Sequence, residues 1–361
     1  MEPTRALHDL GQSIWLDNIT RALLSSGTLK HYIDDLSVTG LTSNPTIFNN
    51  AIKGSTDYDS DIRRRTAAGR TGDDLFFDLA LDDLTRAADL FRLAHDRTCG
   101  VDGWVSLEVS PLLAYDTKTT LAEAKELSAR AARPNLFIKI PGTKEGVPAI
   151  EEAIFAGVPI NVTLLFSREQ YLASAEAYLR GIERRIAAGL APNVTSVASL
   201  FVSRWDTAVA GKVPAELVNT LGVAIGQQTY KAYLDLLASE RYRRVLNAGA
   251  RPQRLLMAST GTKDPKASDI LYVKGLAAPF TINTMPEATL KALADHGGGI
   301  TPIRADGGDC EQVLAKFVKA GIDLGAVAAQ LQSDGAAAFV KSWNELMGVL
   351  ATKSAELKKA G

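Results

Sequence analysis

The chain has 361 residues, of which 46% are hydrophobic, and its 40 basic and 41 acidic residues give a net charge of -1. This length permits either two ordinary domains or one α/β barrel with extensions. A nearly neutral chain has no global field that attracts nucleic acid or an anionic membrane surface, so we expect neither as a partner.

Cysteine, histidine and hydropathy patterns narrow the class of protein further. Cys99 and Cys310 lie far apart, which suits a reducing compartment. The four histidines are scattered without HxxxH or CxxC spacing, so no metal site is expected. The amino terminus lacks the apolar core of a secretory signal, and no apolar run approaches the roughly 18 residues of a membrane span. We therefore expect a cytoplasmic protein.

Eight short runs with β-strand character alternate with longer stretches of helical period. This alternation is typical of a parallel sheet with helices packed outside it. The runs are residues 13–17, 37–44, 105–110, 136–141, 159–166, 195–203, 254–260 and 280–285. Eight strands with intervening helices predict an α/β fold of the (β/α)8 TIM-barrel type, with barrel strands over about residues 13–286.

The remaining stretches predict helices added to this barrel. Ser167 and Gln170 form a capping box where the helix after the fifth run begins. The connection from residue 44 to residue 105 is too long for a simple crossover, so it is expected to hold one or more extra helices. Residues 306–361 are expected to form a helical extension packed on the barrel. We see no second domain, and residues 1–361 are expected to form a single one.

Lys139 is the lone charged residue in the apolar run 136–141. A strand sends alternate side chains to opposite faces, so Phe137 and Lys139 share a face. Lysine is almost never fully buried without a partner or a task. Either Lys139 lies on a strand edge and reaches water through its flexible stem, or it has a chemical role inside the barrel.

Polar residues recur on one face of several runs. Inward side chains near the carboxyl ends of barrel strands are where such folds build their active sites. The alternating pattern places there Asp17, Ser106, Glu108, Asn161 and Thr163. A lysine, carboxylates and polar side chains therefore converge at one end of the predicted barrel.

This set of residues suits carbon–carbon bond chemistry. A neutral lysine attacks a ketone to form a carbinolamine and then an imine, which accepts electrons when the neighbouring carbon–carbon bond breaks. Dehydration of the carbinolamine needs a proton shuttle, for which Glu108 is a candidate through a water held by Thr163. Asp17 is a candidate to take the hydroxyl proton whose loss drives the cleavage.

Each of these residues also has a structural interpretation. Asp17 is a favoured type of helix cap, and Asn44 before Pro45 suits a turn. Glu108 could be an ion-pair partner at a strand end, and Thr163 could be an ordinary strand residue. Their joint placement favours the chemical interpretation.

The motifs resemble those of the transaldolase family, in its longer-chain bacterial branch. The segments that carry the resemblance are GLTSNPTIF at 40–48, VSLE at 105–108, IKIPGT at 138–143 with Glu145 and Gly146, NVTLLFS at 161–167 and SLFVSR at 199–204. Together they cover the barrel from about Ser13 to Met285. Five separate motifs make this resemblance far more specific than a lone short one.

The resemblance implies a class I aldolase-like barrel of the nonoxidative pentose phosphate pathway. Such an enzyme transfers a dihydroxyacetone unit from fructose 6-phosphate or sedoheptulose 7-phosphate to erythrose 4-phosphate or glyceraldehyde 3-phosphate, without a metal or organic cofactor. The catalytic residues that it implies are Lys139 as the Schiff-base nucleophile, Glu108 and Thr163 as the water-mediated proton shuttle, and Asp17 as the acid/base. The substrate-binding residues that it implies are Asn44, Asn161 and Ser199 for donor hydroxyls and Arg204 for the phosphate.

One segment departs from the family pattern. Many members have a Ser-Phe-Arg run after the seventh strand, whereas this chain reads ASTGTK at 258–263. Lys263, assisted by Ser259, is the candidate for the second phosphate contact. The alternative for Lys263 is a solvated loop lysine.

Two other functions remain open. A class I fructose-6-phosphate aldolase-type lyase would use the same lysine but release dihydroxyacetone to water, so a requirement for an acceptor aldehyde distinguishes it from a transferase. A catalytically silent barrel that binds sugar phosphates would need none of this chemistry. A nucleotide-dependent enzyme is disfavoured because no GxGxxG follows a strand and no P-loop motif occurs. The sequence fits a monomer or a homodimer.

Overall fold

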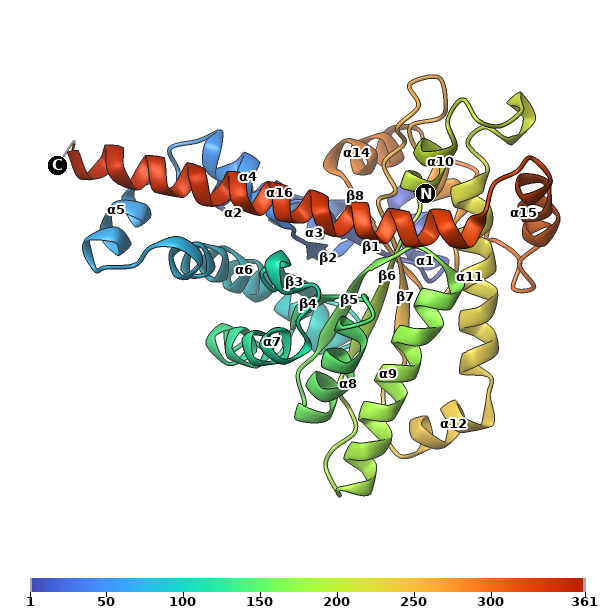
Figure 1. Ribbon diagram of the computed structural model, residues 1–361, viewed down its shortest axis with the longest axis horizontal. Helices are drawn as coiled ribbons and strands as arrows, with labels where there is room; N and C mark the ends of the chain where they lie inside the picture. Colours follow the sequence, from blue (N-terminus) through green and yellow to red (C-terminus); the bar gives the residue numbers. More distant parts are fainter. Residues whose placement is uncertain (1, 360–361) are drawn as a thin grey trace.

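The computed structural model describes residues 2–359, in which eight parallel strands form a closed barrel in sequence order. Strand β1 pairs with both β2 and β8, which closes the ring. The strands are β1 Ser13–Leu16, β2 Val38–Thr42, β3 Trp104–Glu108, β4 Leu136–Pro141, β5 Ile160–Leu165, β6 Ser196–Phe201, β7 Gln253–Ala258 and β8 Ile282–Met285. Each of the eight predicted runs falls on one of these strands, so the predicted TIM barrel is confirmed (Figure 1).

Helices surround the barrel (Figure 1). The first half of the chain contributes α1 Pro3–Asp9, α2 Arg21–Ser25, α3 Thr28–Asp35, α4 Pro45–Lys53, α5 Asp59–Ala67, α6 Gly72–Arg97, η1 Pro111–Leu113, α7 Thr117–Ala131, α8 Gly146–Ala156 and α9 Arg168–Ala187. The second half contributes α10 Ser203–Val209, η2 Ala215–Leu217, α11 Leu221–Leu237, α12 Glu240–Asn247, α13 Leu271–Gly275, α14 Glu287–His296, α15 Cys310–Lys319 and α16 Leu324–Lys359. The extra helices predicted between residues 44 and 105 are therefore α4, α5 and α6. Among residues 2–359, none of these helices combines the length and apolarity needed to cross a lipid bilayer.

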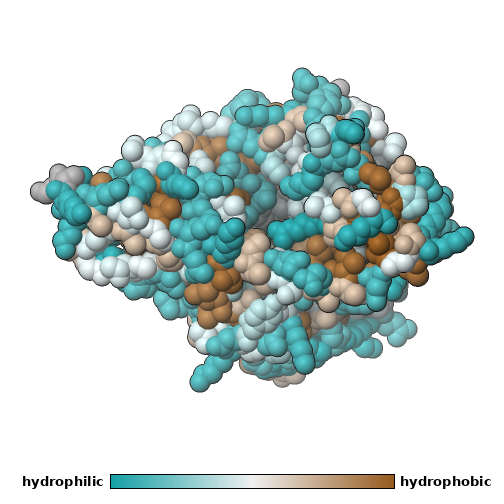
Figure 2. Space-filling view, turned by 45° about the horizontal axis from the view of Figure 1, so that its top comes forward, coloured by the Kyte–Doolittle hydropathy of each residue, from teal (hydrophilic) through white to brown (hydrophobic). Residues whose placement is uncertain are grey.

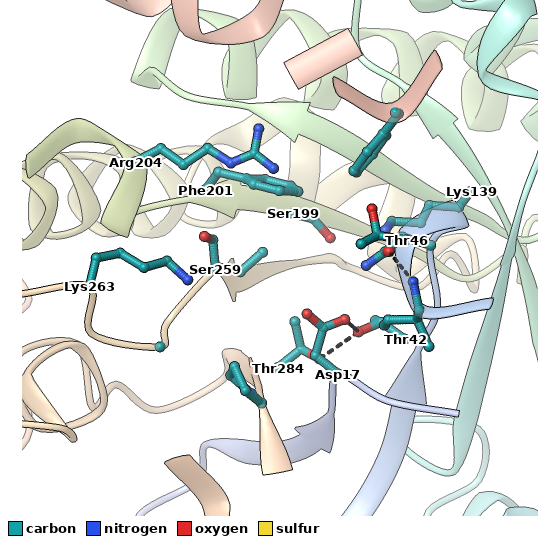
Figure 3. A pocket seen from close by; sticks show the side chains of 16 residues that line it. Asp17, Thr42, Thr46, Lys139, Ser199, Phe201, Arg204, Ser259, Lys263 and Thr284 are labelled. Carbon is teal, nitrogen blue, oxygen red and sulfur yellow. Dashed lines mark hydrogen bonds between the residues drawn. The ribbon is translucent and has the colours of Figure 1, made fainter. Parts of the chain in front are cut away.

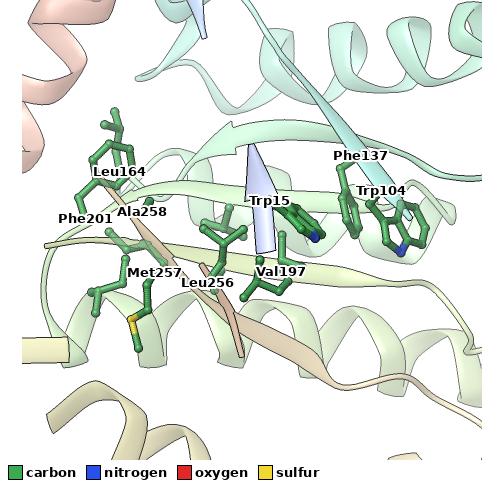
Figure 4. Close-up of a cluster of buried hydrophobic side chains, with 14 of the residues drawn as sticks. Trp15, Trp104, Phe137, Leu164, Val197, Phe201, Leu256, Met257 and Ala258 are labelled. Atoms are coloured by element: carbon green, nitrogen blue, oxygen red, sulfur yellow. The ribbon is translucent and has the colours of Figure 1, made fainter. Parts of the chain in front are cut away.

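Aromatic side chains fill the barrel interior below the strand ends. The rings of Trp104 and Phe137 stack with centroids 4.1 Å apart, and the Trp15 ring lies 6.2 Å from that of Phe137 (Figure 4). Trp15 Nε1 donates a hydrogen bond of 2.8 Å to Asp102 Oδ1, which satisfies the buried indole. These buried rings occupy the interior on the side away from the carboxyl ends of the strands.

Gly40 in β2 makes room for this aromatic layer. A Cβ at this position would lie 2.7 Å from both the Trp15 ring and the carbonyl oxygen of Trp104. The strand and the indole could not both keep their places around an added methyl group. The glycine is therefore required by packing.

The carboxy-terminal helix α16 packs against α4, α5 and α6 and extends across the barrel (Figure 1). The Trp343 ring meets the Phe76 ring edge-on at 4.9 Å and lies 5.7 Å from the Phe77 ring. Lys353 Nζ donates to Asp59 Oδ1 at 2.7 Å and to the Ser55 carbonyl at 2.8 Å. The helix is thus attached to the rest of the fold by both apolar and ionic contacts.

Replacing Gly40 with alanine is expected to lower the free energy of unfolding by about 1–3 kcal/mol, the usual cost of overpacking a core. Urea denaturation followed by circular dichroism measures this change. Gly348→Ala is the matched control, because a Cβ at Gly348 in α16 would meet nothing within 4 Å. The control should raise stability by up to about 1 kcal/mol through its higher helix propensity. Equal stabilities for the two variants would contradict the packing role of Gly40.

Candidate active site

A cavity of about 260 Å³ opens at the carboxyl ends of the strands. Seven of the predicted site residues line it: Asp17, Asn44, Lys139, Ser199, Arg204, Ser259 and Lys263. Lys139 lies toward one end of this cavity, whereas Arg204 and Lys263 lie toward the other, with Asp17 and Thr284 along one side (Figure 3). Of the residues that strand parity placed inward, Asp17 and Lys139 line this space, and the other five residues line it as the family resemblance implies.

Lys139 is buried but faces the cavity. Its side chain extends from β4 at 4% exposure, and Nζ donates a hydrogen bond of 3.2 Å to the Ser43 carbonyl. Nζ also lies 3.5 Å from Glu108 Oε2 and 5.9 Å from the centroid of the Phe339 ring. Strand β4 pairs with β3 on one side and β5 on the other. The alternative that Lys139 reaches water from a free strand edge is therefore wrong.

Glu108 lies directly opposite Lys139 in the register of β3 and β4. It is 4% exposed, and neither carboxyl oxygen has a hydrogen-bond partner among residues 2–359. Burial disfavours the charged form and raises the pKa of Glu108 to about 7, against the opposing attraction of Lys139. Near neutral pH this carboxyl group can therefore both donate and accept a proton.

Asp17 follows β1 and faces the cavity (Figure 3). Thr42 Oγ1 donates a hydrogen bond of 2.8 Å to Asp17 Oδ1, and the hydroxyls of Thr42 and Thr284 lie 2.7 Å apart. Helix α2 is capped by Thr20 rather than by Asp17, so the interpretation of Asp17 as a helix cap is wrong. The two threonines at the ends of β2 and β8 hold the carboxylate in place.

Asn44 caps a helix and also lines the cavity. Its Oδ1 accepts a hydrogen bond of 3.0 Å from the backbone N–H of Ile47, which caps α4. The same side chain lines the cavity. Asn44 and Pro45 therefore begin helix α4 instead of making the turn that was the structural alternative, and the cap does not exclude a role in binding.

Asn161 and Thr163 in β5 do not line the cavity. Asn161 Nδ2 donates to Ser106 Oγ at 3.0 Å, and Ser199 Oγ donates to Asn161 Oδ1 at 2.7 Å. Both β5 side chains are fully buried, and Thr163 Oγ1 has no hydrogen-bond partner among residues 2–359. Asn161 is thus connected to the cavity through Ser199. Glu108 also lies behind the wall, next to Lys139.

Arg204 is a half-buried cation close to two aromatic rings. Its guanidinium carbon lies 5.1 Å from the Phe201 centroid and 6.0 Å from the Phe166 centroid. Burial lowers the pKa of Arg204, while the charges of Asp17 and Glu108 raise it. An arginine remains protonated under these conditions, so it supplies a fixed positive charge to the cavity.

Ser259 and Lys263 occupy the loop after β7. Ser259 adopts a left-handed backbone with φ of 55°, and its hydroxyl lies 2.9 Å from that of Ser203. Lys263 is exposed, as the alternative of a solvated loop lysine predicts, and it also lines the cavity. The departure from the family pattern therefore places a second cation at the same end of the cavity as Arg204.

The predicted site residues did not include nine residues of the cavity wall, among them Thr42, Thr284, Phe201 and Phe339. Thr42, Phe201 and Thr284 belong to predicted strands. The alternation of inward and outward side chains along those strands could therefore have identified them. Phe339 belongs to α16, far from Lys139 in the sequence, and no local pattern distinguishes it from other core residues of that helix.

The fold and this cavity define a TIM-barrel enzyme with its site at the carboxyl ends of the strands. Residues 14–350 match the family described as Transaldolase/Fructose-6-phosphate aldolase. A protein named transaldolase from Saccharopolyspora erythraea is 45% identical over 354 residues, covering 95% of each chain. Transaldolases from Arthrobacter sp. and Thiobacillus denitrificans are each 42% identical, covering 99% and 96% of this chain and 99% of their own. The chain belongs to this family, which confirms the resemblance inferred from its motifs.

The raised pKa of Glu108 can be tested directly by infrared difference spectroscopy. We expect a protonated-carboxyl band that disappears as the pH rises through about 7, because burial favours the neutral acid. The Glu108→Gln variant should lose part of this band, and the part that remains should come from Glu123. Glu123 is the necessary control, since burial also raises its pKa to about 7. A band that persists in Glu108→Gln but vanishes in Glu123→Gln would contradict the assignment.

Proposed function

We propose that this chain is a transaldolase that carries a dihydroxyacetone unit on Lys139 between a ketose phosphate and an aldose phosphate. The main support is a buried lysine amine that faces a cavity while lying 3.5 Å from the Glu108 carboxyl group. Relatives that bear the name transaldolase align with 95% or more of this chain. This geometry and the family motifs support the proposed residue roles.

The first half of the reaction forms the imine. The lysine amine attacks the carbonyl carbon C2 of the ketose, and the carbonyl oxygen takes up a proton to give a carbinolamine. Glu108 in its neutral form donates a proton to the departing hydroxyl, so that water leaves and the protonated imine remains. Thr163 Oγ1 and the Glu108 oxygens are buried without partners among residues 2–359, and they suit a proton path through a bound water.

The second half breaks the bond between C3 and C4. Asp17 accepts the proton of the C4 hydroxyl, and the electrons of the breaking bond move to the imine to form an enamine. The aldose phosphate formed from C4 onward departs, and an acceptor aldose phosphate enters. The enamine attacks its aldehyde, Asp17 returns the proton, and hydrolysis of the new imine releases the product and Lys139.

The rest of the cavity is suited to a phosphorylated sugar. Asn44 and Ser199 lie beside Lys139 on the wall, where they can contact donor hydroxyls, and Asn161 orients Ser199. Arg204 and Lys263 lie at the other end, where they can bind a phosphate. Charged sugar phosphates do not cross membranes unaided, so we place the reaction in the cytoplasm. Either a monomer or a homodimer is compatible with this proposal.

The lyase alternative uses the same imine, since the matching family includes fructose-6-phosphate aldolase. The two activities differ in the fate of the enamine: in a lyase its carbon takes up a proton before the imine is hydrolysed to dihydroxyacetone, whereas in a transferase it attacks the acceptor aldehyde. Measuring the release of free dihydroxyacetone with and without erythrose 4-phosphate distinguishes them. A silent barrel would bind fructose 6-phosphate and convert it under neither condition.

Borohydride reduction in the presence of fructose 6-phosphate should attach a dihydroxyacetone unit to Lys139, to be located by peptide mass spectrometry. Lys139→Ala should lose the adduct and the activity while remaining folded. Lys139→Arg should be equally inactive, because a guanidinium stays protonated and cannot attack a carbonyl. Lys125→Ala, at an exposed lysine of α7, is the control and should react like the parent. An adduct that persists without Lys139 would contradict the mechanism.

Arg204→Met should raise KM for fructose 6-phosphate by about 10- to 150-fold, since a hydrogen bond to a charged group contributes about 1.5–3 kcal/mol. The rate with unphosphorylated fructose should change far less, because that donor lacks the group that Arg204 binds. Arg243→Met, at an exposed position of α12, provides the control. Equal losses with both donors would place Arg204 in general packing rather than in phosphate binding.

A further inference from the structure

Helix α16 is bound to the ends of the two strands that carry Lys139 and Thr163. The side chain of Gln332 in this helix donates from Nε2 to two backbone carbonyls, that of Gly142 at 3.0 Å and that of Leu164 at 2.9 Å. Gly142 directly follows β4, and Leu164 directly follows Thr163 in β5. One amide therefore links both strand ends to the helix.

These carbonyls lie where the pairing of β4 with β5 ends. The register places Lys139 opposite Asn161 and Pro141 opposite Thr163, and Gly142 N–H still donates to the Thr163 carbonyl at 2.7 Å. Gly142 and Leu164 are the next residues in that register. The Gln332 amide thus continues the hydrogen bonding between β4 and β5 by one further residue pair, with a side chain as the donor.

Strand β5 needs this support because its backbone is irregular at the same point. Leu164 has φ of 58°, a left-handed conformation that is unfavourable for a leucine. The register between β5 and β6 also shifts between Val162 and Leu165. The neighbouring Thr163 hydroxyl has no hydrogen-bond partner among residues 2–359, so its direction depends on the backbone that carries it.

The same face of α16 contacts two further groups of the site. A Cβ at Gly335 would lie 2.9 Å from Leu164 Cδ2 and 3.1 Å from Arg204 Nη1, and Phe339 lines the cavity beside Lys139. Residues 332, 335 and 339 have the spacing of one helix face. The face that carries Gln332 is therefore turned toward the proposed reaction centre.

We propose that Gln332 is a positioning residue, which holds the ends of β4 and β5 so that Lys139, Glu108 and Thr163 keep the geometry of imine formation. The inference rests on the proposed function. Gln332 touches neither substrate nor reacting atoms and acts through the backbone. The rest of α16 stays attached without it, because Trp343 and Lys353 bind the helix to α5 and α6 and to the segment before α5.

Gln332→Met and Gln332→Glu remove both donated hydrogen bonds while nearly keeping the length of the side chain. We expect each to lower the rate of imine trapping at saturating fructose 6-phosphate by about 10- to 100-fold, the loss that a misplacement of about 1 Å produces. KM should change little, since the residues proposed to bind substrate remain in place. The matched controls are Gln330→Met and Gln330→Glu, because Gln330 is exposed and donates only within α16, to Asp334 Oδ1. Both control variants should react like the parent.

Several results would overturn the positioning role. A trapping rate in the Gln332 variants equal to that of the controls would do so, as would a raised KM with an unchanged saturated rate, which would assign α16 to binding alone. If both Gln332 variants fail to fold by circular dichroism, the residue serves folding instead. Absence of a Lys139 adduct in the parent enzyme would instead contradict the proposed function, so the two failures are distinguishable.

Discussion

The structure of this site depends on two ionisable groups placed side by side inside a closed barrel. Removing two charges from water costs several kcal/mol per ion, and a buried pair often fails to recover that cost. Lys139 and Glu108 lie 3.5 Å apart at 5% and 3% side-chain exposure, and burial raises the pKa of the carboxyl group to about 7. Such a pair is a poor source of stability. Its presence is better explained by proton transfer to and from groups bound at the lysine amine.

The surroundings of the pair separate the reacting end of the cavity from the charged end. Below it, Trp15, Trp104 and Phe137 occupy the interior, and the cavity opens at the carboxyl ends of the strands. Above it, Arg204 and Lys263 share the cavity with Asp17. An anionic group on the substrate is therefore attracted to the end remote from Lys139. Under the proposed function, a sugar phosphate would extend between the cations and the amine.

Helix α16 contributes to the same site although it lies outside the barrel pattern. Gln332 binds the ends of β4 and β5, Gly335 leaves room for the Arg204 guanidinium, and Phe339 forms part of the wall. Helix α16 thus contributes a hydrogen-bonding side chain, a glycine that leaves space, and an aromatic ring to the site. Its attachment to α4, α5 and α6 makes these contacts part of the folded barrel.

The sequence by itself determined the barrel and most of its site. The two-residue period of the strands specified both the eight runs and the inward direction of Asp17, Glu108, Lys139 and Thr163, because strand parity is a local property. Helix caps such as Ser167 were also predictable, although Gln170 accepts from the Phe166 N–H rather than from that of Ser167 as an ideal capping box would. Only the tertiary structure decided which side chains reach the cavity and which lie behind it, as Asn161 does. It alone brought Gln332, Gly335 and Phe339 to the site, because a helical period identifies a buried face but not the surface that covers it.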